Sequence, residues 1–313
     1  MEIIKIGIQV GLLYGPFALG IYLALGVLSL PDLTLEGSFG IGGATTAIFL
    51  AHGENPALCL AAGIGAGAAA GLVTGILHVR MRMTVLLAGI LMMSAAWSIS
   101  IMIMGSGNVP LIDKRTVFTW VEETGFDNQT ATILVGAGAS SLAAAGLMWF
   151  LRTRYGLSLR ASGMSIQTAR GLGVRTESRQ VIGVVIANGL AAASGGLVVQ
   201  SQGFMDVSIQ VGTIVSGLAA LMIGLSLIRS PKVVPAVLGV LLGLIVYRVV
   251  VAWTLDLGMN PNYVRLATAG VVVLVIGLRV LGPGAALPGT AGASRQRRVR
   301  MQFYEDDRVF RLV

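Results

Sequence analysis

Long apolar runs alternate with shorter polar stretches along the chain. An α-helix needs about 20 apolar residues to cross a bilayer, and nine runs come close to that length: 8–30, 33–52, 57–79, 84–104, 129–151, 181–201, 211–228, 233–254 and 263–281. The longer polar stretches are 105–128, 152–180 and the tail from residue 282. The pattern predicts an all-α polytopic membrane protein with about nine transmembrane helices, and a short surface helix in the stretch 105–128.

Composition agrees with this class. Of the 313 residues 55% are hydrophobic and only 12% are charged, and the mean hydropathy is +0.84. A soluble globular domain carries about 25% charged residues. Glycine is abundant, at 43 residues, and small residues let helix backbones approach closely in lipid. A soluble globular fold is therefore excluded.

The positions of the basic residues predict the orientation of the chain. Of the 22 lysines and arginines, 17 fall in 80–83, 152–180, 229–232 or the tail from Arg279. Cytoplasmic loops carry the excess of basic residues, so we expect the N-terminus outside and the C-terminus in the cytoplasm. The net charge of +8 then reports topology and some attraction for anionic membrane lipid. It does not indicate nucleic acid.

A short phrase occurs twice. Residues 32–36 read DLTLE and residues 206–210 read DVSIQ, so each copy runs acid, aliphatic, hydroxyl, aliphatic, acid or amide. At the same offset Gly43 pairs with Gly217. By the predicted topology the first copy follows a cytoplasmic turn and the second an external one. Related segments of opposite orientation are typical of an inverted repeat, which in transporters often carries discontinuous helices around the substrate path.

The acids of these phrases have two interpretations. Irregular backbone at membrane depth is tolerated where it lines a water-filled cavity, so Asp32, Glu36, Asp206 and Gln210 can lie along a solute path. Alternatively, both segments begin at the membrane interface and the acids cap the helix starts, where a carboxylate accepts free backbone N–H groups. The sequence leaves both open.

No catalytic or metal-binding constellation is visible. Cys59 is the single cysteine, and the two histidines, His52 and His78, lie far apart. No phosphate-binding G-x-x-x-x-G-K-[ST] and no H-E-x-x-H motif occurs. The small-residue run at 194–196 (SGG) fits helix packing. We therefore predict no catalytic residue, no metal and no cofactor, so energy for uphill transport comes from an ion gradient or another chain.

Residues 152–180 form the longest basic interior stretch, RTRYGLSLRASGMSIQTARGLGVRTESRQ. Short helices flanked by Gly156, Gly171 and Gly173 fit its mixed spacing. A loop of nearly thirty residues in a tightly connected membrane protein indicates a purpose. The alternative is a basic loop that rests against lipid headgroups.

Four phrases carry a family resemblance: PDLTLEGSFGIGGATTA, GLVTGILHVRMRMTVLLAGILMM, GLSLRASGMSIQTARGLGV and SQGFMDVSIQVGTIVSGLAALMIG. Together they make the chain, up to about residue 281, resemble membrane permeases of the ABC importer superfamily. The type is that of branched-chain amino acid permeases, and within it the tryptophan/tyrosine transport permeases are most similar. The resemblance covers 1–281 as the transmembrane domain and leaves 282–313 as a cytoplasmic basic tail.

The resemblance implies that 152–180 holds the coupling helix, which docks in a groove of a separate ATP-hydrolysing subunit. Eight residues fall on the family pattern: Gly156, Leu159, Arg160, Ala161, Gly163, Ala169, Gly171 and Gly173. The family often has Asp-Asn where this chain has Met164-Ser165, and Gly-Glu where it has Gly224-Leu225. The contact with the ATPase is expected, but its detailed partners differ.

The resemblance also implies an assembly in a bacterial plasma (inner) membrane. Two permease copies, as a homodimer, form the pore with Asp32, Glu36, Asn188, Asp206 and Gln210 around it. An ATPase dimer and an extracytoplasmic solute-binding protein are the expected partners. The chain itself is then no enzyme, and its solute is expected to be an amino acid or a related small compound.

One rival function and one basic residue remain open at this stage. An ion-gradient-driven secondary transporter or channel would use Asp32, Glu36 and Asp206 as proton or cation sites, since ionisable groups inside a membrane are functional by default. Arg248 can pair with a substrate carboxylate or extend to the outer interface, as long basic side chains do near helix ends.

Overall fold

The computed structural model of the chain describes residues 2–228, 230, 232–256 and 270. These residues belong to one compact unit, 1–275. Its elements are α1 (Glu2–Leu13), α2 (Gly15–Ile21), the π-helix η1 (Tyr22–Val27), α3 (Thr34–Ala51), α4 (Pro56–Arg80), α5 (Val85–Met104), β1 (Asn108–Pro110), α6 (Val117–Glu122), α7 (Asn128–Arg152), α8 (Arg154–Met164), α9 (Ile166–Gly171), α10 (Thr176–Gln202), β2 (Phe204–Asp206), the 3-10 helix η2 (Val207–Gln210), α11 (Thr213–Leu227) and α12 (Val233–Asp256).

An all-α polytopic membrane protein is the architecture that these elements form. Within the described residues six segments are long and apolar enough to cross a membrane, namely α4, α5, α7, α10, η2 with α11, and α12, and the bent pair α1–α2 makes a seventh if it is one span. The predicted run 33–52 forms α3, which is too rich in glycine and hydroxyl residues to be among them. The count of nine is therefore not confirmed. The predicted span 263–281 and the tail 282–313 lie outside the described residues.

The first predicted span, 8–30, is not one straight helix. It is broken between α1 and α2, whose axes differ by 54°. Pro16 has no N–H to donate to the carbonyl of Leu12 four residues earlier. That carbonyl instead accepts the hydroxyl of Ser140 at 2.6 Å, and the Leu13 carbonyl accepts Ser194 at 2.6 Å. Neighbouring helices thus satisfy the freed backbone groups, which is what a break at membrane depth requires.

Small residues bring α3, α4 and α10 into close contact at the centre of the unit. A Cβ on Gly195 of α10 would lie 2.0 Å from the Phe39 carbonyl oxygen of α3, so any larger residue there would push the helices apart. A Cβ on Gly71 of α4 would lie 2.6 Å from the Asn188 Cβ. The SGG run of α10 therefore serves helix packing, as its composition predicts.

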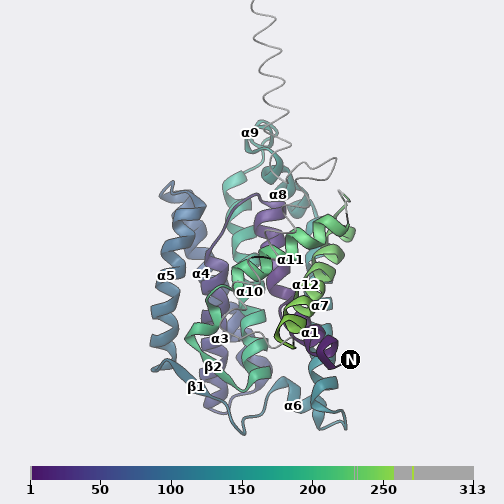
Figure 1. Cartoon of the computed structure of the whole chain (residues 1–313). Coiled ribbons are helices and arrows are strands. Elements are labelled where there is room, and N and C mark those ends of the chain that lie inside the picture. The colour runs from purple at the N-terminus through teal and green to yellow at the C-terminus, as the bar shows by residue number, and fades with distance from the viewer. Residues whose placement is uncertain (1, 229, 231, 257–269, 271–313) are drawn as a thin grey trace, which may run out of the picture. The chain divides into compact units, whose positions relative to one another are not determined.

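The two ends of the bundle carry different connections (Figure 1). The short helices α8 and α9 lie at one end, and the turn from α4 to α5 is at that same end. The opposite end carries α6 and a two-stranded antiparallel sheet of β1 and β2, in which Asn108 pairs with Asp206. The segment 152–180 is therefore folded into two short helices, as expected.

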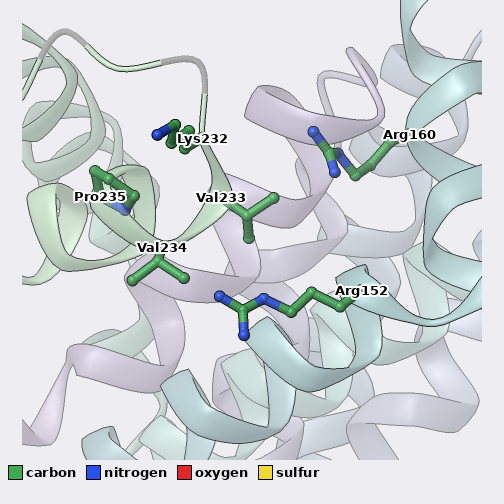
Figure 2. A pocket seen from close by; sticks show the side chains of 6 residues that line it. All are labelled: Arg152, Arg160, Lys232, Val233, Val234 and Pro235. Carbon is green, nitrogen blue, oxygen red and sulfur yellow. The ribbon is translucent and has the colours of Figure 1, made fainter.

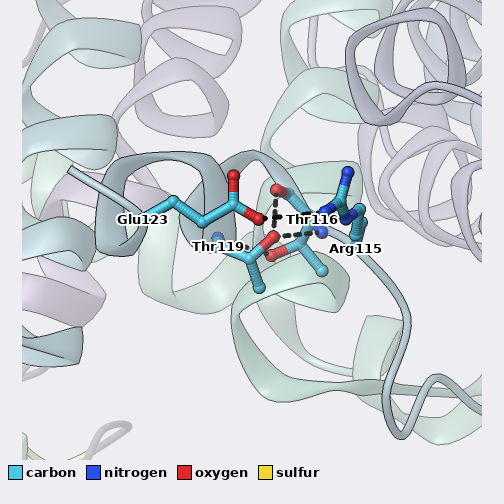
Figure 3. A network of polar contacts seen from close by, with 4 residues as sticks. All are labelled: Arg115, Thr116, Thr119 and Glu123. Atoms are coloured by element: carbon cyan, nitrogen blue, oxygen red, sulfur yellow. Dashed lines mark hydrogen bonds and ion pairs between the residues drawn. The ribbon is translucent and has the colours of Figure 1, made fainter.

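A capping box starts α6, the helix expected in the stretch 105–128. The Thr116 hydroxyl accepts the Thr119 backbone N–H at 3.2 Å, and the Thr119 hydroxyl accepts the Thr116 N–H at 2.9 Å (Figure 3). Arg115, just before the helix, and Glu123, its C-cap residue, add an ion pair at 3.4 Å. Both ends of this short helix are thus fixed by local polar contacts, since six residues alone would not hold a helix.

Candidate functional site

A buried polar cluster lies at the start of α3. Asp32 is only 3% exposed. Its Oδ1 accepts the Thr34 backbone N–H at 2.8 Å, and its Oδ2 accepts the Asn188 side-chain amide of α10 at 2.8 Å. Because a buried carboxylate is costly unless it is hydrogen-bonded, these two donors account for its place inside the bundle. The contact joins two segments that are 156 residues apart.

Asn188 makes further contacts within α3 and α10, and Thr74 extends the cluster to α4. Its Oδ1 accepts the Ser38 hydroxyl at 2.7 Å, and its Nδ2 also reaches the Val184 carbonyl at 2.9 Å. A further hydrogen bond of 2.8 Å joins the hydroxyls of Thr34 and Thr74. The cluster therefore ties together α3, α4 and α10 through side chains that are all buried.

Glu36, one helical turn beyond Asp32, points to a different partner. Its two carboxylate oxygens accept the backbone N–H groups of Gly212 at 3.0 Å and Ile214 at 3.3 Å. These groups stand at the start of α11, where backbone donors lack helical acceptors and the helix dipole favours negative charge. Glu36 is thus the cap of a helix that begins 177 positions later, at Thr213.

Gln210 lies beside this cap. It ends η2 immediately before the α11 start, and its side chain packs directly over Gly40, where a Cβ would lie 1.7 Å from its Oε1. Gln210 is buried, and its Oε1 has no hydrogen-bond partner among the described residues. A buried amide oxygen without a donor costs free energy, so this position carries an unmet hydrogen-bond acceptor between α3 and α11.

Asp206 does not join these residues. It stands at the end of β2 and is half-buried. Its Oδ1 accepts both the hydroxyl and the backbone N–H of Ser208, and its Oδ2 accepts the Asn108 amide at 3.3 Å. The bonds from Ser208 hold the pKa of the Asp206 carboxyl below its usual range. The expected grouping of all five residues is therefore not seen, since Asp206 lies in the sheet end.

Two members of the buried cluster were not singled out from sequence. Ser38 and Thr74 supply hydroxyl groups at 2.7–2.8 Å from Asn188 and Thr34. Ser38 follows Thr34 at helical spacing, which was an available signal. Thr74 lies in an ordinary apolar run, and only the packing of α4 on α3 brings it there.

The coupling residues predicted for 152–180 divide into packed and exposed positions. Leu159 and Ala169 are fully buried. A Cβ on Gly156 would lie 2.1 Å from the Phe150 carbonyl oxygen, and one on Gly163 would lie 1.9 Å from the Val27 carbonyl oxygen. Four of the eight residues thus hold α8 and α9 against the bundle. The rest are Arg160, Ala161, Gly171 and Gly173: the first two are half-buried, and the two glycines meet no atom within 4 Å of an added Cβ.

Hydroxyl caps define α8 and α9. Thr153 accepts the Gly156 N–H at 3.1 Å, and Ser165 accepts the Thr168 N–H at 3.3 Å. Serine and threonine are favoured at such starts because the side chain satisfies a free backbone donor. Large apolar side chains of this pair remain exposed, with Met164 at 87% and Leu172 also on the surface. This end of the bundle therefore presents an apolar surface on two rigidly capped helices.

Arg248 packs at the break in the first predicted span. Its guanidinium carbon lies 3.8 Å from the centre of the Tyr14 ring, at the break between α1 and α2. Tyr14 in turn stacks on Phe39 of α3, with ring centres 5.4 Å apart. A cation over an aromatic face is stabilised when desolvated. Arg248 thus packs inward, and does not extend to the outer interface.

Among the described residues no group of three or more histidine, cysteine, aspartate or glutamate side chains is arranged to hold a metal ion. The donors of the buried cluster are amides, hydroxyls and backbone N–H groups. Such an arrangement can bind and orient polar groups, and it contains no nucleophile paired with a base.

Comparison with known proteins gives the family. Residues 3–277 match the family model described as branched-chain amino acid transport system / permease component. A tyrosine transport system permease protein of Clostridioides difficile (strain R20291) is 32% identical over 82% of this chain and 84% of its own length. An uncharacterised protein of Rickettsia prowazekii (strain Madrid E) is 27% identical over 88% of this chain and 96% of its own length.

A more limited similarity reaches the autoinducer 2 import system permease protein of Escherichia coli (strain K12 / DH10B), which is 36% identical over 35% of this chain and 34% of its own length. No solved structure matches the chain significantly. The family match covers most of the sequence, including the four phrases that carry the resemblance. The chain therefore belongs to the permease components of branched-chain amino acid transport systems, which are multi-pass membrane subunits of ABC-type transporters.

Proposed function

We propose that this chain is the membrane subunit of an ATP-driven importer and forms the path for an amino acid or a related small solute. The observation that carries the proposal is the capped pair α8–α9, which presents exposed Met164 and Leu172 at one end of the bundle. An exposed apolar surface on a rigid element is typical of a protein–protein contact. A dimer of ATPase subunits is the partner that the ABC family requires.

The solute path runs beside α3, at the polar seam with α10 and α11. Asp32 and Asn188 lie where α3 meets α10, and Glu36 and Gln210 lie where α3 meets the start of α11. Gln210 supports the assignment, because its buried amide oxygen lacks a donor within the described residues and a solute N–H can satisfy it. Asp206 stands at the outer entrance of the path.

The two DxxxE/Q phrases support an inverted repeat in this proposal. Asp32 and Asp206 each accept the backbone N–H two residues further on, and each is followed by the start of a helix. The chain is then oriented with its N-terminus outside and its C-terminus in the cytoplasm of a bacterial plasma membrane. Residues 1–281 form the permease domain, with nine spans, and 282–313 the basic tail.

The complete importer contains a second copy of this chain, as a homodimer, and an extracytoplasmic binding protein that delivers the solute. Closure of the ATPase dimer moves α8 and α9, and these helices pass the movement to the bundle through their buried residues Leu159 and Ala169. The permease contributes binding geometry and a gate, while ATP hydrolysis takes place on the ATPase subunits.

Membership of the ABC permease family argues against an ion-gradient-driven secondary transporter or channel. The contacts of the acids argue in the same direction. Asp32 and Glu36 each accept two hydrogen bonds from within the chain, one on each carboxylate oxygen, so both acids already have structural partners. Uptake is therefore expected to follow cellular ATP and to persist when the ion gradient is dissipated.

The docking surface can be tested by co-purification. Tagged wild-type chain, purified from its native host in a mild detergent, is expected to bring down an ATPase in about equal molar amount by quantitative mass spectrometry. Met164→Glu places a charge in the middle of the apolar surface, and we expect it to lose most of the ATPase. Met81→Glu is the matched control, since Met81 is also an exposed methionine and follows α4 outside the α8–α9 pair.

Equal ATPase recovery with both variants would contradict the docking role of α8–α9. Absence of any ATPase from the wild-type preparation in several mild detergents would contradict the importer assignment itself. Elution of each variant as a single species on size exclusion keeps a folding defect apart from a binding defect.

A further inference from the structure

A basic pocket lies at the same end of the bundle as α8, between that helix, the end of α7 and the start of α12. Its volume is about 390 Å³, and it is lined by Arg152, Arg160, Lys232, Val233, Val234 and Pro235. Both arginine side chains extend toward Val233 and Val234, and Lys232 lies beyond Val233 (Figure 2). Three chain segments thus bring three cations to one small cavity.

Among the residues that the structure describes, no acidic side chain lines this pocket. The two ion pairs found among the described residues, Arg115–Glu123 and Arg170–Glu177, are elsewhere. Like charges in one cavity repel each other, and because Arg152 and Lys232 are exposed, an anion can reach them and offset this repulsion. The helix α12 begins at Val233, which lines the pocket, so the positive end of its helix dipole lies nearby.

The depth of the pocket points to the source of the anion. Arg152 is the last residue of the span α7, and Val233 is the first residue of the span α12. The pocket therefore lies where the apolar part of both helices begins, at the level of lipid headgroups. By the predicted topology this is the cytoplasmic leaflet, which is the one that carries anionic lipid.

Apolar side chains continue the pocket toward the membrane. Trp149 precedes Arg152 by three residues on α7 and is 72% exposed. Leu238 follows Pro235 by three residues on α12 and is 48% exposed. Residues three apart share a helix face, so Trp149 lies one turn from Arg152 on α7 and Leu238 one turn from Pro235 on α12. These two exposed side chains make up an apolar strip on the membrane side of the pocket. A free phosphate would use only the cations, whereas a phospholipid would use both parts.

We propose that this pocket binds the phosphodiester headgroup of an anionic phospholipid, with its acyl chains against the strip of Trp149 and Leu238. Arg152 and Arg160 donate to the phosphate oxygens, because the guanidinium fork matches them, and Lys232 adds a third charge. The lipid thereby links α8, which belongs to the proposed coupling pair, to α12.

The test uses purified full-length chain in a neutral detergent and two water-soluble probes, dihexanoyl-phosphatidylglycerol and dihexanoyl-phosphatidylcholine. Binding is followed by microscale thermophoresis. The wild type is expected to prefer phosphatidylglycerol. One basic residue near an anionic lipid surface changes binding about fivefold, so Arg152→Gln with Lys232→Gln should weaken phosphatidylglycerol binding about 25-fold.

Arg154→Gln is the matched control, since Arg154 is an exposed arginine of α8 outside the pocket, and we expect it to bind as the wild type does. Arg152→Lys, which keeps the charge but loses the guanidinium fork, should bind phosphatidylglycerol more weakly than the wild type and more tightly than the double variant. Inorganic phosphate and ATP serve as competitors, and neither is expected to displace the lipid.

Three results would overturn the proposal: equal binding of the two lipids, unchanged phosphatidylglycerol binding by the double variant, or an equal loss in the Arg154→Gln control. Displacement by inorganic phosphate or ATP would overturn the lipid as occupant and assign the pocket to a soluble phosphate. Arg160 is left intact in every variant, so the outcome is independent of the coupling assignment.

Discussion

The two copies of the repeated phrase form the same local turn in very different surroundings. Asp32 and Asp206 each accept the backbone N–H of the residue two positions on, at 2.8 and 2.7 Å. Each also accepts a side-chain amide, from Asn188 and Asn108 respectively. Asp32 is buried at the contact of α3 and α10, while Asp206 is half-buried at the end of a two-stranded sheet. The repeated phrase thus specifies the local turn after each aspartate. The surrounding packing determines whether the aspartate joins α3 to α10 or β2 to β1.

The last residues of the two phrases differ more. Glu36 reaches across to the backbone N–H groups that start α11, so the first copy caps the helix that follows the second copy. Gln210 lies over Gly40 of the first copy and has a buried oxygen without a partner among the described residues. The two copies are therefore in direct contact. Glu36 of the first copy caps α11, whereas the side-chain oxygen of Gln210 in the second copy accepts no hydrogen bond within the described residues.

The largest difference in stability between the copies is expected when the asparagine that donates to each aspartate is replaced. Asn188→Ala leaves a buried Asp32 oxygen without its donor, and we expect the free energy of unfolding to fall by about 3 kcal/mol. Asn108→Ala removes the matching bond at an exposed site and should cost less than about 1 kcal/mol. Unfolding in mixed micelles titrated with a denaturing detergent measures both. Equal losses would contradict the difference in burial.

The paired glycines provide a second comparison. A Cβ on Gly217 would lie 2.1 Å from Ile21 Cδ1 and 2.9 Å from the Phe17 ring, whereas one on Gly43 would meet Met205 and Val199 only at 3.0 Å. Overpacking in a dense core costs about 1–3 kcal/mol, so Gly217→Ala should lower stability by about 2 kcal/mol and Gly43→Ala by clearly less. The same unfolding assay measures the stability of both variants. A larger loss in Gly43→Ala than in Gly217→Ala would contradict the tighter packing around Gly217.

Removing the charge of Glu36 is expected to have a moderate effect. Glu36→Gln weakens the interaction with the positive end of α11, and a carboxylate at such a site contributes about 1 kcal/mol. Glu54→Gln, in an exposed turn, serves as the control and should leave the unfolding midpoint unchanged. If Glu36→Gln is as stable as the wild type, the contact with Gly212 and Ile214 is not a stabilising cap.

The smallest effect is expected from Asp206, and only in acid. Its pKa is lowered in the folded protein, mainly by the Ser208 hydroxyl. A lowered pKa means that the ionised carboxyl stabilises the fold above the ordinary aspartate range near 4, and that this contribution is lost as pH falls through the folded value. Asp206→Asn should therefore match the wild type in acid and be slightly less stable at neutral pH. A larger difference in acid than at neutral pH would contradict the assigned hydrogen bonds.

The sequence predicts the spans well, because a run of apolar residues is a local signal. The described helices from α4 to α12 begin and end close to the predicted limits. Short helices do form in 152–180, but Gly156 lies inside α8 and does not flank it. The break between α1 and α2 was missed although Gly15-Pro16 marks it, since the apolar run continues through it. What holds the break, Ser140 and Ser194, lies on other helices.

The candidate site was predictable only in part. Asp32 and Glu36 stand out as acids among apolar residues, but their partners are 156 and 176 residues away, so only tertiary packing reveals that they bind different helices. Asp206 shows the limit of a local sequence pattern. Its sequence phrase is nearly the same as that of Asp32, yet the chain places it in the sheet end, because β2 precedes it.

The most direct test is uptake of radiolabelled tyrosine and tryptophan by cells that depend on this permease, with variants expressed at matched levels. If the seam beside α3 forms the path, Asp32→Asn and Glu36→Gln lower uptake about tenfold, which corresponds to about 1.4 kcal/mol, while Asp206→Asn retains at least about half. Uptake that falls equally in all three variants, or stays at the wild-type rate in Glu36→Gln, would contradict the account.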